Sequence, residues 1–383
     1  MRIGITTFGA DGNRSGIGQY IINLLAGLAE VGPRESCEVL AHRSERDVFA
    51  GPGTPFAVRT VSDRVRQPLL NVAWHQVALP AWCARRKYDV LFLPAANRRV
   101  PFKVPCPTVG TVHDFSALHV AGKYDAARTA YITRVLPRLV RGLTRVVTVS
   151  ESSKHDIVRY AGVPEERVHV IHSAADARAF VPGDREASRR RMAAAHGIDG
   201  PYVLYVARIE HPGKNHVRLI EAFERAKSAA SLPHKLVLAG SDWSGADEVH
   251  RAARASRVVR DIVFTGYVPG ADLPDLYRGA DLAVCPSLYE GFGMPVLEAM
   301  ACGTAVACSN VSSLPEVAGD AAALFDPFDV DEMANTMRRI LAAPAQRASL
   351  EARGLARNRL FSWRTSAART LEVLRMAAAE GCA

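Results

Sequence analysis

Two glutamates flank a glycine-rich turn within residues 289–305, YEGFGMPVLEAMACGTA. The glycines loosen the backbone, and Pro295 suits the first turn of a helix, where its missing N–H group is not needed. We therefore expect Glu290 in the loop before this helix and Glu298 about one turn inside it. Because a helix N-terminus attracts anions, the turn could bind a phosphate while the carboxylates hold hydroxyl groups. A capped core helix with one stabilising acid fits this stretch equally well.

Two cations follow the first strand-like run of the second half, in YVARIEHPGKN. Arg208 stands at the end of the run and Lys214 comes six residues later. A flat, forked guanidinium and a compact ammonium together suit two phosphate groups. Another run ends in GYV at 266–268, where backbone groups of Tyr267 and Val268 could contact the edge of a nucleotide base.

In the first half, NRSGIGQY at 13–20 follows the first strand-like run, and Gly16 and Gly18 would let a phosphate approach a helix start. A dinucleotide fingerprint needs a third glycine where Ile21 stands, so a nicotinamide or flavin cofactor is poorly supported and a tight structural turn stays open. His113 and Asp114 end the run TVGTVHD. A histidine there can donate to a hydroxyl or a phosphate, although a structural role is commoner.

The scaffold for these residues is indicated by two series of apolar, strand-like runs that alternate with helical patterns. The first series comprises 2–8, 88–95, 106–114 and 145–151, and the second 202–208, 235–241, 261–268, 282–287 and 304–310. Strands that alternate with helices predict a parallel sheet with both faces covered.

The repetition predicts an α/β protein of two Rossmann-like, doubly wound domains that face each other across a cleft. A length of 383 residues also favours two domains. We expect an N-terminal domain at 1–174 and a C-terminal domain at 175–363, with a helix at 364–383 packed back on the first. Ligands in such folds bind outside the carboxyl ends of the strands, where the polar residues described above stand.

Composition indicates a globular, cytoplasmic protein. Hydrophobic residues make up 48% and charged residues 23%, and no run approaches the ~18 apolar residues of a membrane helix. The start, MRIGITTFGADG, is too short in its apolar part for a signal peptide. The seven cysteines form no Cys-x-x-Cys pair and fit reduced thiols. A net charge of +9 favours anionic partners, but aromatic residues do not interleave with the basic runs, so we expect no nucleic acid.

Six motifs follow one another along nearly the whole chain: SGIG, TVHD, VTVSESSKHDI, VARIEHPGKN, FTGYV and, at 287–322, SLYEGFGMPVLEAMACGTAVACSNVSSLPEVAGDAA. Together they resemble the GT-B glycosyltransferases, and in particular the retaining family 4 (glycosyl transferases group 1), which includes many bacterial cell-envelope mannosyl- and glucosyltransferases. Glu290 and Glu298 match that family's glutamate pair. IHSAAD at 171–176 departs from the Asn-Gly-Val-Asp often found in relatives, and this difference concerns the expected hinge.

The resemblance implies a role for each candidate residue. Arg208 and Lys214 would neutralise the donor diphosphate, Glu290 would hold sugar hydroxyls, and Glu298 would hold the ribose. Gly16 would contact the diphosphate from the opposite domain, and His113 would lie beside the reacting sugar and acceptor. The implied catalytic set is His113, Arg208, Lys214 and Glu290, and the implied donor-binding set is Gly16, Gly18, Tyr267, Val268, Gly291, Phe292, Gly293, Met294 and Glu298.

The resemblance also implies the reaction and its substrates. Family enzymes retain the anomeric configuration through same-face attack on an oxocarbenium-like sugar, with the leaving phosphate taking the acceptor proton. The domain at 175–363 would bind the nucleotide-sugar donor, and the domain at 1–174 a glycan, lipid-linked or small-molecule acceptor. No cofactor is expected.

More than one donor sugar and more than one class of function remain open. EHPGKNH and the end of the 287–322 motif resemble enzymes of polysaccharide and O-antigen assembly, many of which use GDP-mannose, so we rank GDP-mannose first and UDP-glucose or another UDP-sugar second. A GT-B sugar phosphorylase is disfavoured because no lysine motif for pyridoxal phosphate is found. A non-catalytic nucleotide-sugar-binding partner protein is the alternative from another class.

Two further segments could indicate metal binding or membrane attachment. Asp329 and Asp331 in FDVDE form an Asp-x-Asp pair, but they precede a helical pattern, so we expect a helix cap and no metal site. Residues 127–145, ARTAYITRVLPRLVRGLTR, would place four arginines on one helical face beside apolar residues, with Pro137 bending the helix or marking its start: Arg134, Arg138, Arg141 and Arg145. Such a helix could lie on an anionic membrane at the inner face of the cell membrane, although a buried helix with solvated arginines is the simpler interpretation.

Overall fold

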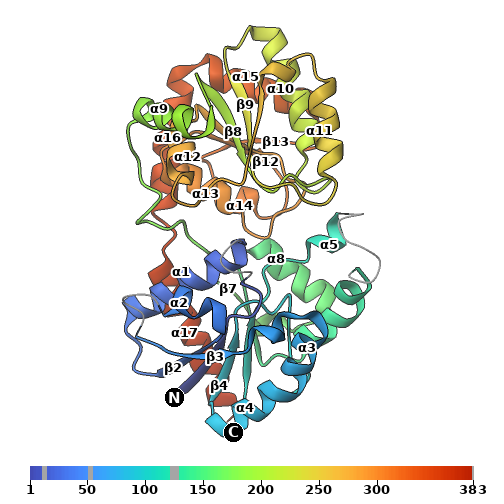
Figure 1. Cartoon of the computed structure of the whole chain (residues 1–383), viewed down its shortest axis with the longest axis vertical. Helices are drawn as coiled ribbons and strands as arrows, with labels where there is room; N and C mark the ends of the chain where they lie inside the picture. Colours follow the sequence, from blue (N-terminus) through green and yellow to red (C-terminus); the bar gives the residue numbers. More distant parts are fainter. Residues whose placement is uncertain (11–14, 51–54, 121–128, 382–383) are drawn as a thin grey trace. The chain divides into compact units, whose positions relative to one another are not determined.

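The computed structural model describes residues 1–10, 15–50, 55–120 and 129–381, and the chain forms two compact units. Unit 1 contains Met1–Phe115, Ala126–Ser173 and Ser362–Ala383, and unit 2 contains Ser116–Asp125 and Ala174–Phe361. Each unit has its own sheet with helices packed on it (Figure 1). The C-terminal segment thus returns to the unit that contains the N-terminus.

Over the described residues, unit 1 has a seven-stranded parallel sheet in the order β3-β2-β1-β4-β5-β6-β7. The central strands are buried along their length, as expected for a sheet covered on both faces. The strands are β1 (Arg2–Thr6), β2 (Ser36–His42), β3 (Ala57–Val61), β4 (Val90–Leu93), β5 (Thr108–Thr111), β6 (Arg145–Thr148) and β7 (Val168–Val170).

Two long helices of unit 1 pack closely together, α1 (Gly16–Val31) and α17 (Trp363–Glu380). A Cβ atom on Gly27 of α1 would lie 2.5 Å from the backbone oxygen of Trp363, so only glycine permits this approach. The other helical segments of unit 1 are η2 (Arg43–Glu45), α2 (Arg46–Phe49), η3 (Asp63–Arg66), α3 (Pro68–Ala73), η4 (Trp74–Ala78), α4 (Leu79–Arg86), η5 (Tyr131–Val135), α7 (Leu136–Arg141), α8 (Glu151–Asp156), η6 (Ile157–Ala161) and η7 (Glu165–Arg167).

Unit 2 repeats the architecture with a six-stranded parallel sheet over the described residues, in the order β10-β9-β8-β11-β12-β13. Its strands are β8 (Tyr202–Val206), β9 (Lys235–Ala239), β10 (Ile262–Gly266), β11 (Leu282–Cys285), β12 (Val306–Ser309) and β13 (Ala323–Phe325). Its helical segments are α5 (Ser116–His119), α9 (Arg185–His196), α10 (His216–Ala230), α11 (Ala246–Ala255), η8 (Val259–Asp261), α12 (Leu273–Gly279), α13 (Met294–Ala301), α14 (Leu314–Ala318), α15 (Val330–Ala342) and α16 (Pro344–Asn358).

Both strand orders are doubly wound, so the prediction of two Rossmann-like sheets is confirmed. In each sheet the strand order reverses beside the first strand of the unit, between β1 and β4 and between β8 and β11. The loops that leave the carboxyl ends of these strands are the places where such folds bind ligands. All nine predicted strands are present, and four others were not predicted: β2, β3, β7 and β13.

The prediction for the arginine-rich segment 127–145 needs correction. Arg145 is not on the helix, because α7 ends at Arg141 and Arg145 begins β6, where it pairs with Glu380. Pro137 lies in the first turn of α7. The apolar residues of α7 are packed into unit 1, so its exposed face carries arginine side chains, whereas Arg128 lies outside the described residues. Within the part of the chain that the structure describes, no helix is both long and apolar enough to cross a membrane.

Candidate active site

The loop after β8 carries the two predicted cations of unit 2. Arg208 is exposed at the carboxyl end of the strand, and its guanidinium lies 4.8 Å from the ring centroid of Trp243. The same group is 3.3 Å from Oε2 of the buried Glu210. The ring face and the carboxylate hold the cation at the edge of the sheet and leave much of it in contact with solvent.

Lys214 and Glu290 form an ion pair between the loops that follow β8 and β11. Lys214 Nζ donates to Glu290 Oε1 over 2.6 Å, and both side chains are largely buried. Burial opposes the charge on the ammonium group, but attraction and the hydrogen bond from Glu290 outweigh it and raise the pKa of Lys214. Lys214 is therefore fully charged at neutral pH.

Four hydroxyl groups hold the Glu290 loop in place. Ser287 Oγ donates to Glu290 Oε1 over 2.6 Å and lies 2.9 Å from the hydroxyl of Tyr205, which donates to the backbone oxygen of Lys214. Ser312 accepts from the Glu290 N–H, and Ser313 donates to the Glu290 carbonyl. Carboxylate and backbone are thus fixed separately, which orients the ion pair.

Helix α13 begins directly after this loop. Its N-cap is Gly293, with φ of 108°, and Pro295 lies in the first turn as predicted. A Cβ atom at Gly293 would lie 2.8 Å from Leu314 Cδ2, so the turn also needs glycine for space. Because glycine has no side chain with which to cap the helix, the backbone of Gly291–Met294 alone forms the anion-attracting end.

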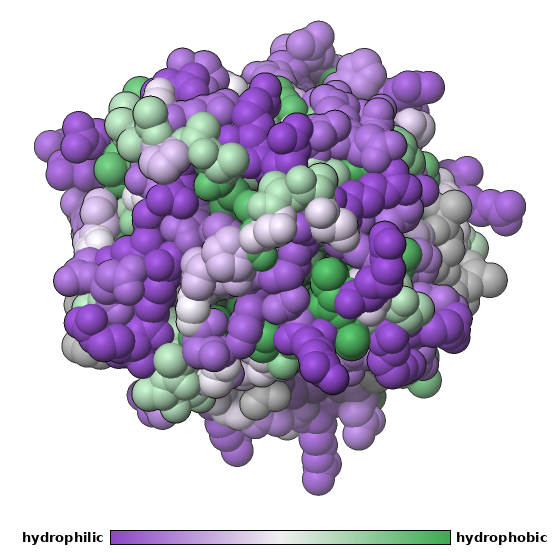
Figure 2. All heavy atoms as spheres, turned by 90° about the horizontal axis from the view of Figure 1, so that it is seen from above, coloured by the Kyte–Doolittle hydropathy of each residue, from purple (hydrophilic) through white to green (hydrophobic). Residues whose placement is uncertain are grey.

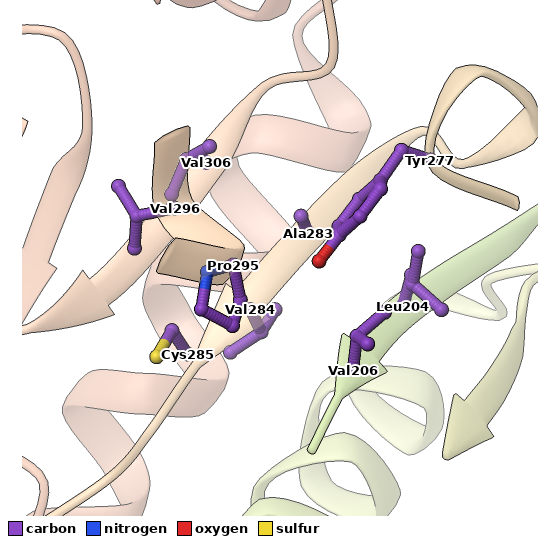
Figure 3. Close-up of a pocket in the computed structure, with 9 residues that line it drawn as sticks. All are labelled: Leu204, Val206, Tyr277, Ala283, Val284, Cys285, Pro295, Val296 and Val306. Atoms are coloured by element: carbon purple, nitrogen blue, oxygen red, sulfur yellow. The ribbon is translucent and has the colours of Figure 1, made fainter. Parts of the chain in front are cut away.

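Glu298 lies one turn into α13 and accepts from the Tyr277 hydroxyl over 2.9 Å. Burial raises the pKa of Glu298 to about 7, and the bond from Tyr277 offsets only part of this effect. Tyr277 also lines a small, mainly apolar pocket between β8, β11 and the start of α13, and its hydroxyl points toward the middle of the lining residues (Figure 3). The lining residues are Leu204, Val206, Tyr277, Ala283, Val284, Cys285, Pro295, Val296 and Val306.

Tyr267 and Val268 follow the end of β10 in unit 2. The Tyr267 side chain is exposed, whereas that of Val268 is buried. The carbonyl of Gly266 accepts from the Gly240 N–H, which joins this loop to the end of β9. The two residues therefore lie at the same edge of the sheet as Arg208, two strands away.

In unit 1, Gly16 and Gly18 lie in the first turn of α1, and His113 follows the end of β5. Ser15 caps α1 by accepting from the Gly18 N–H. Among the described residues, apart from the chain neighbours of Gly16 and the backbone of α1 itself, no atom lies within 4 Å of where a Cβ on Gly16 would stand. His113 Nε2 is 2.9 Å from the carbonyl oxygen of Pro94, so Nε2 carries the proton. Burial lowers the pKa of His113, and Tyr20 of α1 packs edge-on against the neutral ring at 4.6 Å.

The structure brings two of the predicted residues of unit 2 into contact and gives two others different partners. Lys214 contacts Glu290, whereas Glu298 bonds to Tyr277 and Arg208 to Glu210. Gly16, Gly18 and His113 belong to unit 1.

Several residues that position the site were not predicted from the sequence. Ser287 stands just after β11, so the rule that selected Arg208, a polar residue at a strand end, also applies to it. Tyr277 lies inside α12 and Ser312 and Ser313 precede α14, where no such pattern distinguishes them.

The Asp-x-Asp pair has a structural role. Asp329 caps α15 by accepting from the N–H groups of Asp331 and Glu332, as predicted. Asp331 pairs with Arg225. Among the described residues, no group of three or more His, Cys, Asp or Glu side chains is placed to hold a metal ion.

Comparison with known families matches both halves of the chain. Residues 14–178 match the family described as Glycosyltransferase Family 4, and residues 188–357 match Glycosyl transferases group 1. The chain is 32% identical over 315 residues to the O-antigen chain mannosyltransferase B of Escherichia coli, a match that covers 81% of each protein.

Solved structures match over nearly the full length. A sucrose-phosphate synthase from Thermosynechococcus elongatus aligns with a TM-score of 0.76 at 21% identity, covering 99% of this chain and 100% of that one. Alr3699/HepE of Anabaena, in complex with UDP and glucose, aligns with a TM-score of 0.74 at 19% identity, covering 98% and 100%. At such identities these likenesses concern the fold, which agrees with the two doubly wound sheets.

Proposed function

Since this chain belongs to glycosyltransferase family 4, in the glycosyl transferases group 1, we propose that it transfers mannose from GDP-mannose to a glycan, lipid-linked or small-molecule acceptor. The coarser function follows from the family: the protein is a retaining hexosyltransferase that uses a nucleotide sugar. The choice of mannose is supported by the similarity to the O-antigen chain mannosyltransferase of Escherichia coli.

The Lys214–Glu290 pair beside the start of α13 is the observation that carries the site assignment. In our proposal Lys214 and Arg208 neutralise the diphosphate, whose negative charge grows as the bond to the sugar breaks. Glu290 keeps one carboxylate oxygen on Lys214 and Ser287 and offers the other to hydroxyl groups of the sugar. The N–H groups at Gly291–Met294 would hold the same anion or the sugar.

Glu298 would accept hydrogen bonds from the ribose. Its Oε2 is oriented by Tyr277, and ribose hydroxyls that donate to the carboxylate would favour the charged form that burial disfavours. Tyr267 and Val268 would contact the base through their backbone groups.

Unit 1 would bind the acceptor and would add a contact to the donor diphosphate. The open space at Gly16 suits the approach of a phosphate to the start of α1. His113 is held neutral with its proton on Nε2, so Nδ1 is the nitrogen that accepts, and in our proposal it receives a hydrogen bond from a hydroxyl of the sugar or the acceptor. The six described cysteines are free and five of them are buried, which fits the cytoplasmic location that we propose.

The test is a transfer assay on the purified protein with GDP-mannose, UDP-glucose and other UDP-sugars, which follows both sugar transfer and nucleotide release. We expect GDP release from GDP-mannose and retention of configuration in the product. If a UDP-sugar is turned over in preference to GDP-mannose, the proposed donor is wrong but the reaction is still sugar transfer. Tight nucleotide-sugar binding with neither transfer nor hydrolysis would indicate the non-catalytic binding protein.

A further inference from the structure

The helical segment from α3 through η4 to α4 belongs to unit 1 (Figure 1). It exposes a row of apolar side chains. A buried row recurs every four residues along one side: Asn71, His75, Leu79 and Cys83. An exposed row with the same spacing lies between them: Leu69, Ala73, Val77 and Ala81. Leu69 and Val77 are 85% and 72% exposed, and Leu70 and Val72 are exposed beside them. This side of the segment therefore has apolar residues where a water-facing helix normally has charged ones.

A neighbouring loop extends the apolar row. Gln76 of η4 accepts from the Phe102 N–H over 2.8 Å and donates to the Val100 carbonyl over 3.2 Å. These bonds hold Phe102 beside the segment, with its side chain 77% exposed. We call the exposed side chains of Leu69, Leu70, Val72, Val77 and Phe102, with the exposed cations Arg64, Arg85 and Lys103, the α3–α4 surface.

Charge in this part of the chain is strongly one-sided. Residues 64–113 contain eight lysines and arginines and one acid, Asp89, a difference of +7. The whole chain has a net charge of +9, so 50 residues account for most of it. Residues 67–84 contain no Asp, Glu, Lys or Arg at all, and the cations stand at either end of this stretch and beside Phe102.

Two other exposed parts of the described chain differ from this surface. On the face of the molecule in Figure 2, hydrophilic residues prevail and hydrophobic ones form small separate groups, as is normal for a protein surface. Helix α7 exposes Arg138 and Arg141, but its Leu136, Leu139 and Val140 are buried. It therefore offers charge without apolar surface.

We propose that the α3–α4 surface binds an anionic lipid bilayer, with its apolar side chains in the headgroup boundary and its cations on lipid phosphates. A soluble polyanion would pair with the cations but leave the apolar row in water. A second copy of the same surface would bring two strongly basic regions together. An anionic bilayer satisfies both features at once, because it offers negative charge above an apolar phase. The inference does not depend on which sugar the enzyme transfers.

The experiment is co-sedimentation of the full chain with vesicles of phosphatidylcholine, with and without phosphatidylglycerol. The test variant combines Leu69→Gln, Val77→Gln and Phe102→Gln. A matched control, Val259→Gln with Phe328→Gln and Leu360→Gln, removes three exposed apolar side chains from unit 2. A third variant, Arg134→Gln with Arg138→Gln and Arg141→Gln, tests α7.

We expect the unchanged protein and the unit 2 control to bind only vesicles that contain phosphatidylglycerol, more weakly as salt increases. The test variant should lose about tenfold or more in vesicle affinity, since burial of a single leucine-sized side chain changes an equilibrium about tenfold. Its sugar transfer to a water-soluble acceptor without vesicles should stay unchanged, which separates this result from failure of the proposed function.

Four outcomes would overturn the proposal. Unchanged binding by the test variant, or equal binding to neutral vesicles, would remove the α3–α4 surface from consideration. Loss of binding by the α7 variant alone would move the contact to that helix. A change from dimer to monomer in the test variant, measured by light scattering, would identify the surface as an interface between copies of the chain.

Discussion

Single residues in the candidate site differ in how firmly the fold holds them. Lys214 is anchored through Glu290, Ser287 and the backbone, whereas Arg208 is exposed over Trp243 and contacts one carboxylate. A fixed charge stabilises a developing anion without first having to reorient, while an exposed arginine can follow the diphosphate as it binds. We therefore propose that Lys214 mainly stabilises the transition state. Arg208 would contribute both to binding of the donor and to stabilisation of the transition state.

Removing either cation should slow transfer. We expect Lys214→Ala to lower kcat about a hundredfold or more, because a preorganised donor to the developing anion is lost. Arg208→Ala should lower kcat/KM by a similar factor, and more of this loss should come from a raised KM than in Lys214→Ala. Steady-state kinetics with the donor varied measures both. Lys235→Ala is the matched control, since this lysine pairs with Asp199 at the amino end of β9. Near-normal turnover in both site variants, with the fold intact, would contradict the assignment.

Glu298 should make donor binding depend on pH. Its pKa in the free protein is about 7, above the ordinary 4.5, so the carboxyl is protonated below neutral pH and charged above it. Ribose hydroxyls bind better to the charged form, which accepts two hydrogen bonds, and we expect the Kd for GDP to fall as pH rises through about 7. Titration of GDP binding by calorimetry at several pH values measures this.

In the protein without ligand, the raised pKa of Glu298 should make folding stability decrease as pH rises, whereas the affinity for GDP should increase. A carboxyl with a raised folded-state pKa stabilises the fold below the unfolded value of 4.5, and this contribution is lost as pH rises through about 7. Glu298→Gln should flatten both the binding and the stability profiles across this range. A pH dependence of GDP binding that persists in Glu298→Gln would assign it to another group.

At the scale of elements, two glycines at helix starts serve different purposes. Gly293 has a φ that side chains disfavour and is crowded by Leu314, so the fold itself requires glycine there. Gly16 begins α1 with open space around the missing side chain. Among the described residues nothing requires glycine at that position, and in our proposal glycine there lets the donor phosphate approach.

The two positions should therefore respond oppositely to alanine. Gly293→Ala should lower the free energy of unfolding by about 1–3 kcal/mol through backbone strain. Gly16→Ala should leave stability unchanged or slightly higher, since it only restricts the unfolded chain, and should weaken donor use. Urea unfolding and donor KM, measured on both variants, compare them directly. If Gly16→Ala leaves the donor KM unchanged, the proposed phosphate contact is wrong.

The start of α15 carries the prediction about metal. Because Asp329 caps the helix, Asp329→Ala should cost roughly 0.5–2 kcal/mol of stability and leave kcat unchanged. Transfer should survive excess EDTA, since Lys214, Arg208 and the α13 N-terminus neutralise the diphosphate in our proposal. Loss of transfer on chelation that magnesium or manganese restores would show a need for metal and reopen Asp329 and Asp331 as candidates.

At the scale of the whole molecule, the two units have separate sheets and separate cores. The candidate donor residues lie mostly in unit 2, and ligand binding stabilises the state that binds it. GDP at 100 times its Kd should stabilise the protein by about 2.7 kcal/mol. We expect hydrogen exchange to slow most in the loops after β8, β10 and β11, with a smaller effect at the start of α1. Protection concentrated in unit 1 would contradict the placement of the donor.

The elements that depend on local pattern could be predicted from the sequence. Nine strands follow from apolar runs, the start of α13 follows from Pro295, and the cap at Asp329 follows from a carboxylate before a helix. Strand β3 is mostly exposed, and β7 and β13 are only three residues long, so none of the three shows a clear apolar run. In β2 the buried Glu38, neutralised by Arg86, Arg59 and a bond from Tyr88, interrupts the apolar pattern.

The sequence by itself determined the fold class and the residue types of the site, because periodicity and motif spacing are properties of neighbouring residues. Only the tertiary structure decided which partner each charge finds: Glu290 reaches Lys214 across 76 residues of chain, and Glu298 reaches Tyr277. It also decided that the apolar side of α7 is buried and that of α3 is exposed, although both segments combine apolar residues with nearby arginines. Burial depends on which distant segments pack against a helix, and that information is absent from the local pattern.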